Sequence, residues 1–110
     1  MKQGDIYFAN LNPTKGREQQ GMRPVLIVSG NALNDNLDIV IIMPLTTKIK
    51  GYAPSLFLKK DKHNGLKENS EVISFHIRAI SKERLANKLG RITHEQLTEI
   101  KQKLNEVLTF

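Results

Sequence analysis

Two polar segments of the sequence carry side chains that could act on a phosphate group. The first is the loop-like stretch 11–23, in which a carboxylate, Glu18, precedes a guanidinium, Arg23. An arginine presents forked donors that suit phosphate oxygens. The second follows an apolar run, and there the hydroxyl of Thr46 could donate a hydrogen bond to a phosphoryl oxygen. Together these residue types favour chemistry on a phosphate-containing substrate.

Spacing alone also allows simpler interpretations. Glu18 and Arg23 are close enough in the sequence to form an ordinary loop salt bridge, and spacing by itself favours that interpretation. Threonines such as Thr46 commonly do no more than end a strand. His76 can equally be an ordinary strand histidine.

The scaffold around these segments is predicted to consist of short strands. The 11–23 loop contains Gly16 and Gly21, which allow unusual backbone conformations, and it is stiffened at its ends by Pro13 and Pro24. Turn residues occupy 30–36, and a polar connection covers 60–69. The strands are expected over residues 5–10, 24–29, 37–45, 55–59 and 70–78.

The last predicted strand, 70–78, alternates in character. Ile73, Phe75 and Ile77 share one face, which is expected to pack into the core, while Ser74, His76 and Arg78 share the other, polar face. The 37–45 run is instead apolar on both faces, which is typical of a strand covered on both sides.

The C-terminal segment predicts a helix. Thr93 and Gln96 have the spacing of a capping box, and an apolar stripe follows them. Ser81 is expected to cap a short helical turn over 82–86. Strands followed by a helix predict one domain, residues 1–110, that is a mostly antiparallel sheet or small barrel with helices at one end. The stripe consists of Leu97, Ile100, Leu104, Val107 and Leu108.

Composition narrows the function. Seventeen Lys and Arg against 11 Asp and Glu give a net charge of +6, which favours an anionic partner such as nucleic acid or simply a basic protein. Without cysteine there is no disulfide, thiolate metal site or cysteine nucleophile, and the three histidines lack metal-ligand spacing, so no metal or cofactor is expected. No apolar stretch could span a bilayer, and no secretory signal is evident, so the cytoplasm is expected.

Several blocks of the sequence resemble the MazF/PemK family of toxin endoribonucleases. The most specific block runs from Pro13 to Pro24 and contains both Glu18 and Arg23. The resemblance implies a five-stranded, SH3-like barrel with a C-terminal helix, assembled as a homodimer. It also implies cleavage of single-stranded RNA (mRNA) without a metal, leaving 2′,3′-cyclic phosphate and 5′-hydroxyl ends. A cognate antitoxin would inhibit the enzyme, and the two would bind DNA as a complex. The blocks are Gly4–Tyr7, Leu11–Ser29, Pro44–Thr47 and His76–Leu85.

Matched residue by residue, the resemblance makes Arg23 and Thr46 catalytic and assigns the loop acid to Glu18. Arg23 is expected to stabilise charge, since its pKa above about 12 makes it a poor proton donor. The general acid is not identified. Further RNA contacts are expected at Lys15, Arg17, Gln19, Thr47, Lys48, Ser70, His76 and Arg78.

The match departs from the family pattern where an acidic residue and a glutamine usually precede Ile-Arg. This chain has Phe75 and His76 there. We expect His76 to contact an RNA base and Phe75 to lie in the core. Two alternatives from other classes stay open at this point: a gyrase poison of the CcdB type, which shares the barrel fold, and a family member that binds RNA without cutting it.

Overall fold

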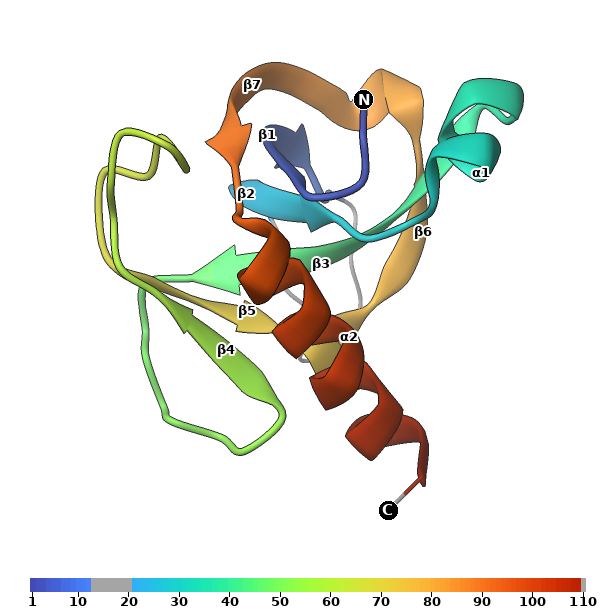
Figure 1. Ribbon diagram of the computed structural model, residues 1–110. Helices are drawn as coiled ribbons and strands as arrows, with labels where there is room; N and C mark the ends of the chain where they lie inside the picture. The colour runs from blue at the N-terminus through green and yellow to red at the C-terminus, as the bar shows by residue number, and fades with distance from the viewer. Residues whose placement is uncertain (13–20, 110) are drawn as a thin grey trace.

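The computed structural model describes residues 1–12 and 21–109 (Figure 1). Two short 3₁₀ helices, η1 (Ser74–His76) and η2 (Lys82–Arg84), interrupt the second half of the sheet. The remaining elements are β1 (Asp5–Asn10), β2 (Met22–Ile27), α1 (Asn31–Asn36), β3 (Ile39–Thr46), β4 (Ser55–Leu58), β5 (Ser70–Ile73), β6 (Arg78–Ser81), β7 (Leu85–Arg91) and α2 (His94–Thr109).

Within these residues, seven strands form one antiparallel sheet in the order β4-β5-β3-β2-β1-β7, with β6 also paired to β3. The mostly antiparallel sheet with a C-terminal helix confirms the predicted fold class. The SH3-like barrel of about five strands fits only loosely, because in the described part of the chain seven strands are present and β4 and β7, at opposite ends of the strand order, do not pair. The arrangement is barrel-like only in a loose sense.

The core lies on both faces of the central strands, as the apolar 37–45 run predicted. Val40 and Ile42 of β3 pack into one buried cluster, whereas Met43 and Leu45 pack into the other. The second cluster is covered by α2, which crosses one face of the sheet and contributes the fully buried Ile100 (Figure 1). A strand buried on both sides holds its ends in fixed positions, which matters for the residues at those ends.

The capping box of α2 is confirmed. The Thr93 hydroxyl oxygen accepts a hydrogen bond from Gln96 N at 3.1 Å, and the Gln96 side chain accepts one from Thr93 N at 2.9 Å. Leu97 and Leu104 pack on the core as predicted, but Leu108 is 75% exposed, because it lies in the final turn beyond the sheet. Among the described residues, no helix is long and apolar enough to cross a membrane.

Three local predictions need correction. The second strand begins at Met22 rather than Pro24, so Arg23 belongs to β2. The 30–36 turn segment contains the short helix α1, in which the buried Asn34 amide donates to Ser29 O at 3.0 Å. The helical turn after Ser81 stops at Arg84, although Ser81 does accept a hydrogen bond from Glu83 N, and the chain continues as β7, which was not predicted.

The 60–69 connection is anchored to β7 rather than only exposed. The buried Asn64 accepts hydrogen bonds from Asp61 N and Leu66 N and donates one to Lys59 O. Gly65 has φ of +68° and lies so close to β7 that a Cβ there would be 1.9 Å from Leu89 O. The backbone of this turn is therefore packed directly against the backbone of the strand.

Candidate active site

Arg23 and Thr46 are brought to the same end of two neighbouring strands. Strands β2 and β3 pair with Val25 opposite Pro44 and Leu26 opposite Met43. Arg23 and Thr46 each lie two residues beyond the last of these pairs, Val25 and Pro44. Two residues that are far apart in the sequence thus lie at the same end of neighbouring strands, next to the buried Val25 and Leu45.

Thr46 is held at the edge of the core with only 8% of its surface exposed. Its hydroxyl oxygen accepts a hydrogen bond from Lys48 N at 3.1 Å. A hydroxyl has one donor and two acceptor positions, so accepting from the backbone leaves its own O–H available to donate to a ligand. Arg23 is half-buried, and its backbone is fixed by pairing with Ala9 of β1.

The other loop residues predicted to take part, Glu18, Lys15, Arg17 and Gln19, lie outside the described residues. The role of Glu18 as a base therefore stays a prediction, and the simpler Glu18–Arg23 salt bridge is likewise not tested.

The predicted strand 70–78 is wrong, because it is two strands separated by η1. Continuing the register of β5 along β3 would put Phe75 opposite Ile42, but Arg78 of β6 occupies that place, so the three residues of η1 are looped out of the pairing. The fully buried Ser74 fixes this corner, since its hydroxyl donates to Pro54 O at 2.5 Å.

The corner changes the positions of Phe75 and His76. Phe75 is 41% exposed rather than in the core, because strand alternation stops at Ile73. Its ring centroid lies 5.9 Å from that of Tyr52 and 5.0 Å from that of His76, both in edge-to-face geometry. An exposed aromatic cluster, Tyr52–Phe75–His76, therefore stands where a polar strand face was expected.

This aromatic cluster lines a cavity of about 350 Å³ together with Thr46 and Lys48. The half-buried His76 has its Nδ1 atom buried, and no hydrogen-bond partner for it is found among the described residues. Three of the predicted site residues, Thr46, Lys48 and His76, are thus brought together. Arg78 begins β6 and pairs with Ile42, and it does not line this cavity.

Glu71 was missed by the sequence analysis. It lies opposite Thr46 in the β3–β5 pairing and is 3% exposed. Its carboxylate accepts hydrogen bonds from Gly51 N at 2.9 Å and Lys50 N at 3.4 Å, so it holds the loop that carries Lys48 and Tyr52. A carboxylate inside the otherwise apolar Val72–Ile73 strand is the signal that could have identified it.

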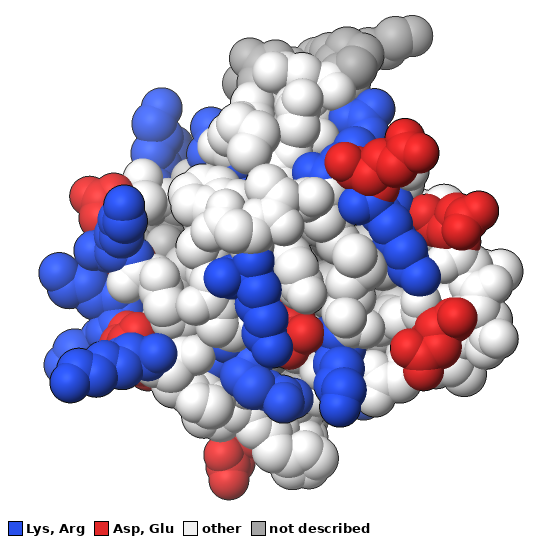
Figure 2. Space-filling view, turned by 90° about the horizontal axis from the view of Figure 1, so that it is seen from above, with Lys and Arg blue, Asp and Glu red and all other residues white. Residues whose placement is uncertain are grey.

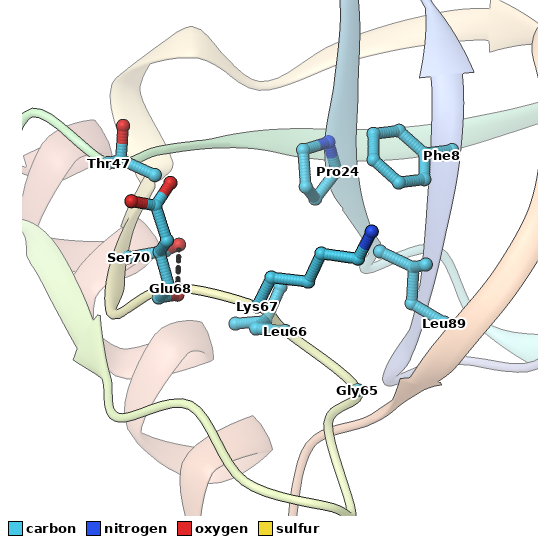
Figure 3. Close-up of a pocket in the computed structure, with 9 residues that line it drawn as sticks. All are labelled: Phe8, Pro24, Thr47, Gly65, Leu66, Lys67, Glu68, Ser70 and Leu89. Carbon is cyan, nitrogen blue, oxygen red and sulfur yellow. Dashed lines mark hydrogen bonds between the residues drawn. The ribbon is translucent and has the colours of Figure 1, made fainter.

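The two remaining predicted residues, Thr47 and Ser70, line a different and smaller cavity with Phe8 and Pro24 (Figure 3).

Lys and Arg side chains gather at the centre and left of the face seen in Figure 2, while several acidic side chains lie toward its right. Within residues 1–12 and 21–109, no group of three or more His, Cys, Asp or Glu side chains is placed to hold a metal.

Comparison with known proteins identifies the family of this chain. The family model for the PemK-like, MazF-like toxin of type II toxin–antitoxin systems matches residues 2–108. Endoribonuclease EndoA of Bacillus subtilis (strain 168) is 32% identical over 105 residues, covering 94% of this chain and 90% of that protein.

Solved structures extend the likeness to the whole fold. MazF (Form-I) from Deinococcus radiodurans superposes with a TM-score of 0.87 at 27% identity, covering 100% of this chain and 97% of that one. A mycobacterial endoribonuclease in complex with its cognate antitoxin has a TM-score of 0.82 at 25% identity, covering 98% and 94%. The chain therefore belongs to the PemK-like, MazF-like toxin family of type II toxin–antitoxin systems.

Proposed function

We propose that this protein is an endoribonuclease toxin that cleaves single-stranded RNA. The proposal is supported by the register of β2 and β3, which brings Arg23 and Thr46 to the same end of two paired strands. The similarity to an endoribonuclease along nearly the full chain supports it.

The chemistry follows from the groups at this end of the sheet. The ribose 2′-oxygen forms a bond to the adjacent phosphorus, the bond from phosphorus to the 5′-oxygen breaks, and the products are a 2′,3′-cyclic phosphate and a 5′-hydroxyl. One proton leaves the 2′-hydroxyl and another arrives on the 5′-oxygen. RNA supplies its own nucleophile, so the protein has to orient the attack and stabilise the charge that develops on phosphorus.

Arg23 and Thr46 are suited to stabilising that charge. The Arg23 guanidinium offers forked donors to the phosphoryl oxygens, and the Thr46 hydroxyl adds a further donor from the opposite strand. Glu18 is proposed as the base that takes the 2′-proton. Because a fixed guanidinium supplies the positive charge, the reaction proposed here needs no metal ion.

The cavity beside Thr46 is proposed to contact an RNA base. Aromatic rings stack on bases of any sequence, and His76 adds hydrogen-bonding atoms that can distinguish them. Lys48, on the rim of the same cavity, is placed to contact a phosphate of the backbone.

The partners are proposed by analogy with the relatives. A mycobacterial relative has been solved with its cognate antitoxin, and the net charge of +6 suits an acidic inhibitory segment. We propose that such a segment covers Arg23, that the toxin is a homodimer active in the cytoplasm, and that DNA is bound only by the toxin–antitoxin complex.

The deciding experiment is incubation of the purified protein with a long RNA in the presence of EDTA. We expect fragments with 2′,3′-cyclic phosphate and 5′-hydroxyl ends, identified by their response to phosphatase and kinase. Binding without cleavage would instead identify a non-catalytic member of the family. Inhibition of gyrase with no effect on RNA would favour a gyrase poison.

A further inference from the structure

A second cavity, of about 200 Å³, is lined by Pro24 and Thr47, which follow Arg23 and Thr46 in the chain. Its walls are apolar, and its rim is polar. Figure 3 shows the rings of Phe8 and Pro24 next to each other, with the Lys67 side chain extending toward them and the Glu68 carboxylate on the side of Thr47 and Ser70. The walls are formed by Phe8, Pro24, Leu66 and Leu89.

The cavity is built from backbone that has little freedom to move. Phe8 and Pro24 are direct partners in the β1–β2 pairing. The turn that carries Leu66 is held by the buried Asn64 and by the backbone contact between Gly65 and Leu89. A preformed apolar cleft with a few polar groups at its edge is the usual form of a small-ligand site.

Its position relates it directly to the proposed reaction. Pro24 follows Arg23 in the chain, and Thr47 follows Thr46. Thr46 lines the aromatic cavity while Thr47 lines this apolar one. The two cavities are therefore lined by neighbouring residues of the segment where the cleaved phosphate is proposed to lie.

We propose that the apolar cavity binds one base of the RNA substrate, next to the cleaved bond and separate from the cavity that His76 lines. The proposal rests on the proposed function. The flat aromatic ring of Phe8 suits the face of a base, which stacks on aromatic side chains, and the Pro24 ring beside it extends the apolar surface. The volume is below the roughly 300–1,000 Å³ of a site for a drug-sized ligand, so a single flat ring fits better than a larger group.

The rim also favours a base over a side chain of an antitoxin. A base has an apolar face and a hydrogen-bonding edge, and the cavity offers both together. Glu68 can only accept hydrogen bonds when ionised. It would accept a hydrogen bond from the exocyclic amino group of adenine, cytosine or guanine. Uracil has no amino group and offers only its ring N3–H, so the cavity should disfavour uracil.

Two substitutions test the proposal. Phe8→Leu removes the stacking ring, with Tyr7→Leu as the control because Tyr7 lies on the same strand but packs into the other buried cluster. Glu68→Gln removes the charge of an exposed residue at nearly the same size, with the exposed Glu99→Gln on α2 as its control. The melting temperature of each variant shows whether it is folded. The rate and sequence profile of cleavage are then compared on an RNA pool that is randomised at the nucleotides on either side of the site cut by the unchanged protein.

We expect Phe8→Leu to lower kcat/KM by about 5- to 150-fold, the range typical of one base–aromatic stack. Glu68→Gln should reduce discrimination against uracil by about tenfold, at one flanking position only, as expected for one hydrogen bond to a charged group. The two control variants should keep the rate and the sequence profile.

Unchanged rate and profile in both test variants, with RNA still cut, would overturn the base site and leave the proposed function intact. A changed inhibition by the antitoxin with an unchanged RNA profile would identify a peptide pocket and would also overturn it. Binding of short RNAs from the same pool is measured in parallel, so the site is tested even if no RNA is cut. Failure of the unchanged protein to cut or bind any RNA would overturn both proposals.

Discussion

The strands β1–β3 and the segment 70–91 contribute to the site in different ways. The first three strands pair in one uninterrupted register and place Arg23 and Thr46 at a fixed end of the sheet. The 70–91 segment is interrupted by η1, by η2 and by register shifts between β1 and β7. These irregular places carry Phe75, His76 and Leu89, which line the two cavities.

The comparison indicates a division of roles. Regular pairing provides the precise placement that phosphoryl chemistry needs, because catalytic groups lose effect when they are displaced by about 1 Å. Irregular backbone instead turns side chains out of the strand pattern and makes cavities for substrate. Substitutions in the first region should therefore change the rate for every RNA, while those in the second should change stability or the choice of sequence.

The largest effect is expected from Arg23→Ala. Removing one preorganised charge-stabilising group typically costs about 100- to 1,000-fold in rate, and the loss should be similar for every RNA sequence that is cut. The side chain is only half-buried, so the protein should stay folded, which its melting temperature checks. Single-turnover cleavage of several RNAs measures this, and near-normal rates would show that the catalytic end of the sheet is assigned wrongly.

The two regions also differ in how well the sequence predicted them. The apolar 37–45 run and the Thr93–Gln96 capping box are local signals, and both appear in the structure as expected. Strand β7 was missed because its sequence around Asn87 and Gly90 lacks strand character. Its place depends instead on pairing with β1 and on close contact with the 63–65 backbone. No local pattern reports such a contact.

The same reasoning applies to the candidate site. Arg23 and Thr46 were predicted from residue type and from the resemblance, and the register explains how they meet. The position of Phe75 was wrong because the hydrogen bond from Ser74 to Pro54, which joins residues far apart in the sequence, bends the chain where alternation suggested a continuous strand. Glu71 and Tyr52 were not predicted as site residues, because their link is a hydrogen bond between Glu71 and the backbone of Gly51, beside Tyr52, and both line the aromatic cavity.

The next largest effect is expected from Gly65→Ala. The new Cβ would lie 1.9 Å from Leu89 O, a backbone atom that cannot rotate away. We expect a loss of about 2–4 kcal/mol in the free energy of unfolding, measured with urea, as is typical of severe backbone strain. Gly51→Ala is the matched control, because Gly51 also has positive φ but has open space around it.

Gly51→Ala should cost only the backbone strain of a left-handed residue, about 1–2 kcal/mol. Equal losses for the two variants would mean that the 60–69 turn is not packed against β7 as closely as the structure shows. The proposed base site, which is lined by Leu66 of this turn and Leu89 of β7, would then lose its rigid wall.

A smaller effect is expected from Ser74→Ala. The hydroxyl is fully buried and donates to Pro54 O, so its removal leaves a carbonyl without that partner. Such a loss costs about 1–3 kcal/mol. Ser81→Ala removes a weaker bond at the start of η2 and should cost less. If Ser74→Ala is no more destabilising than Ser81→Ala, the η1 corner is held by something other than this hydrogen bond.

The smallest change in stability is expected from Phe75→Ala. Truncating a buried phenylalanine costs about 3–5 kcal/mol. At 41% exposure, Phe75 should lose only its edge-to-face contacts with Tyr52 and His76, at about 1 kcal/mol or less. Urea denaturation distinguishes the two magnitudes, and a loss of 3 kcal/mol or more would return Phe75 to the core and restore the continuous strand that alternation predicts.

The same variant sharpens the assignment of the aromatic cavity. Phe75→Ala should shift the sequence profile of cleavage, as should His76→Ala, because both side chains line the cavity that contains Thr46. Phe57→Ala is the matched control, since Phe57 is 51% exposed on β4 but does not line that cavity. A shift for Phe75 and His76 with none for Phe57 would place base recognition at the irregular corner. A loss of rate that is uniform across all sequences would instead place both residues with Arg23 in the catalytic group, and the division between the two regions would fail.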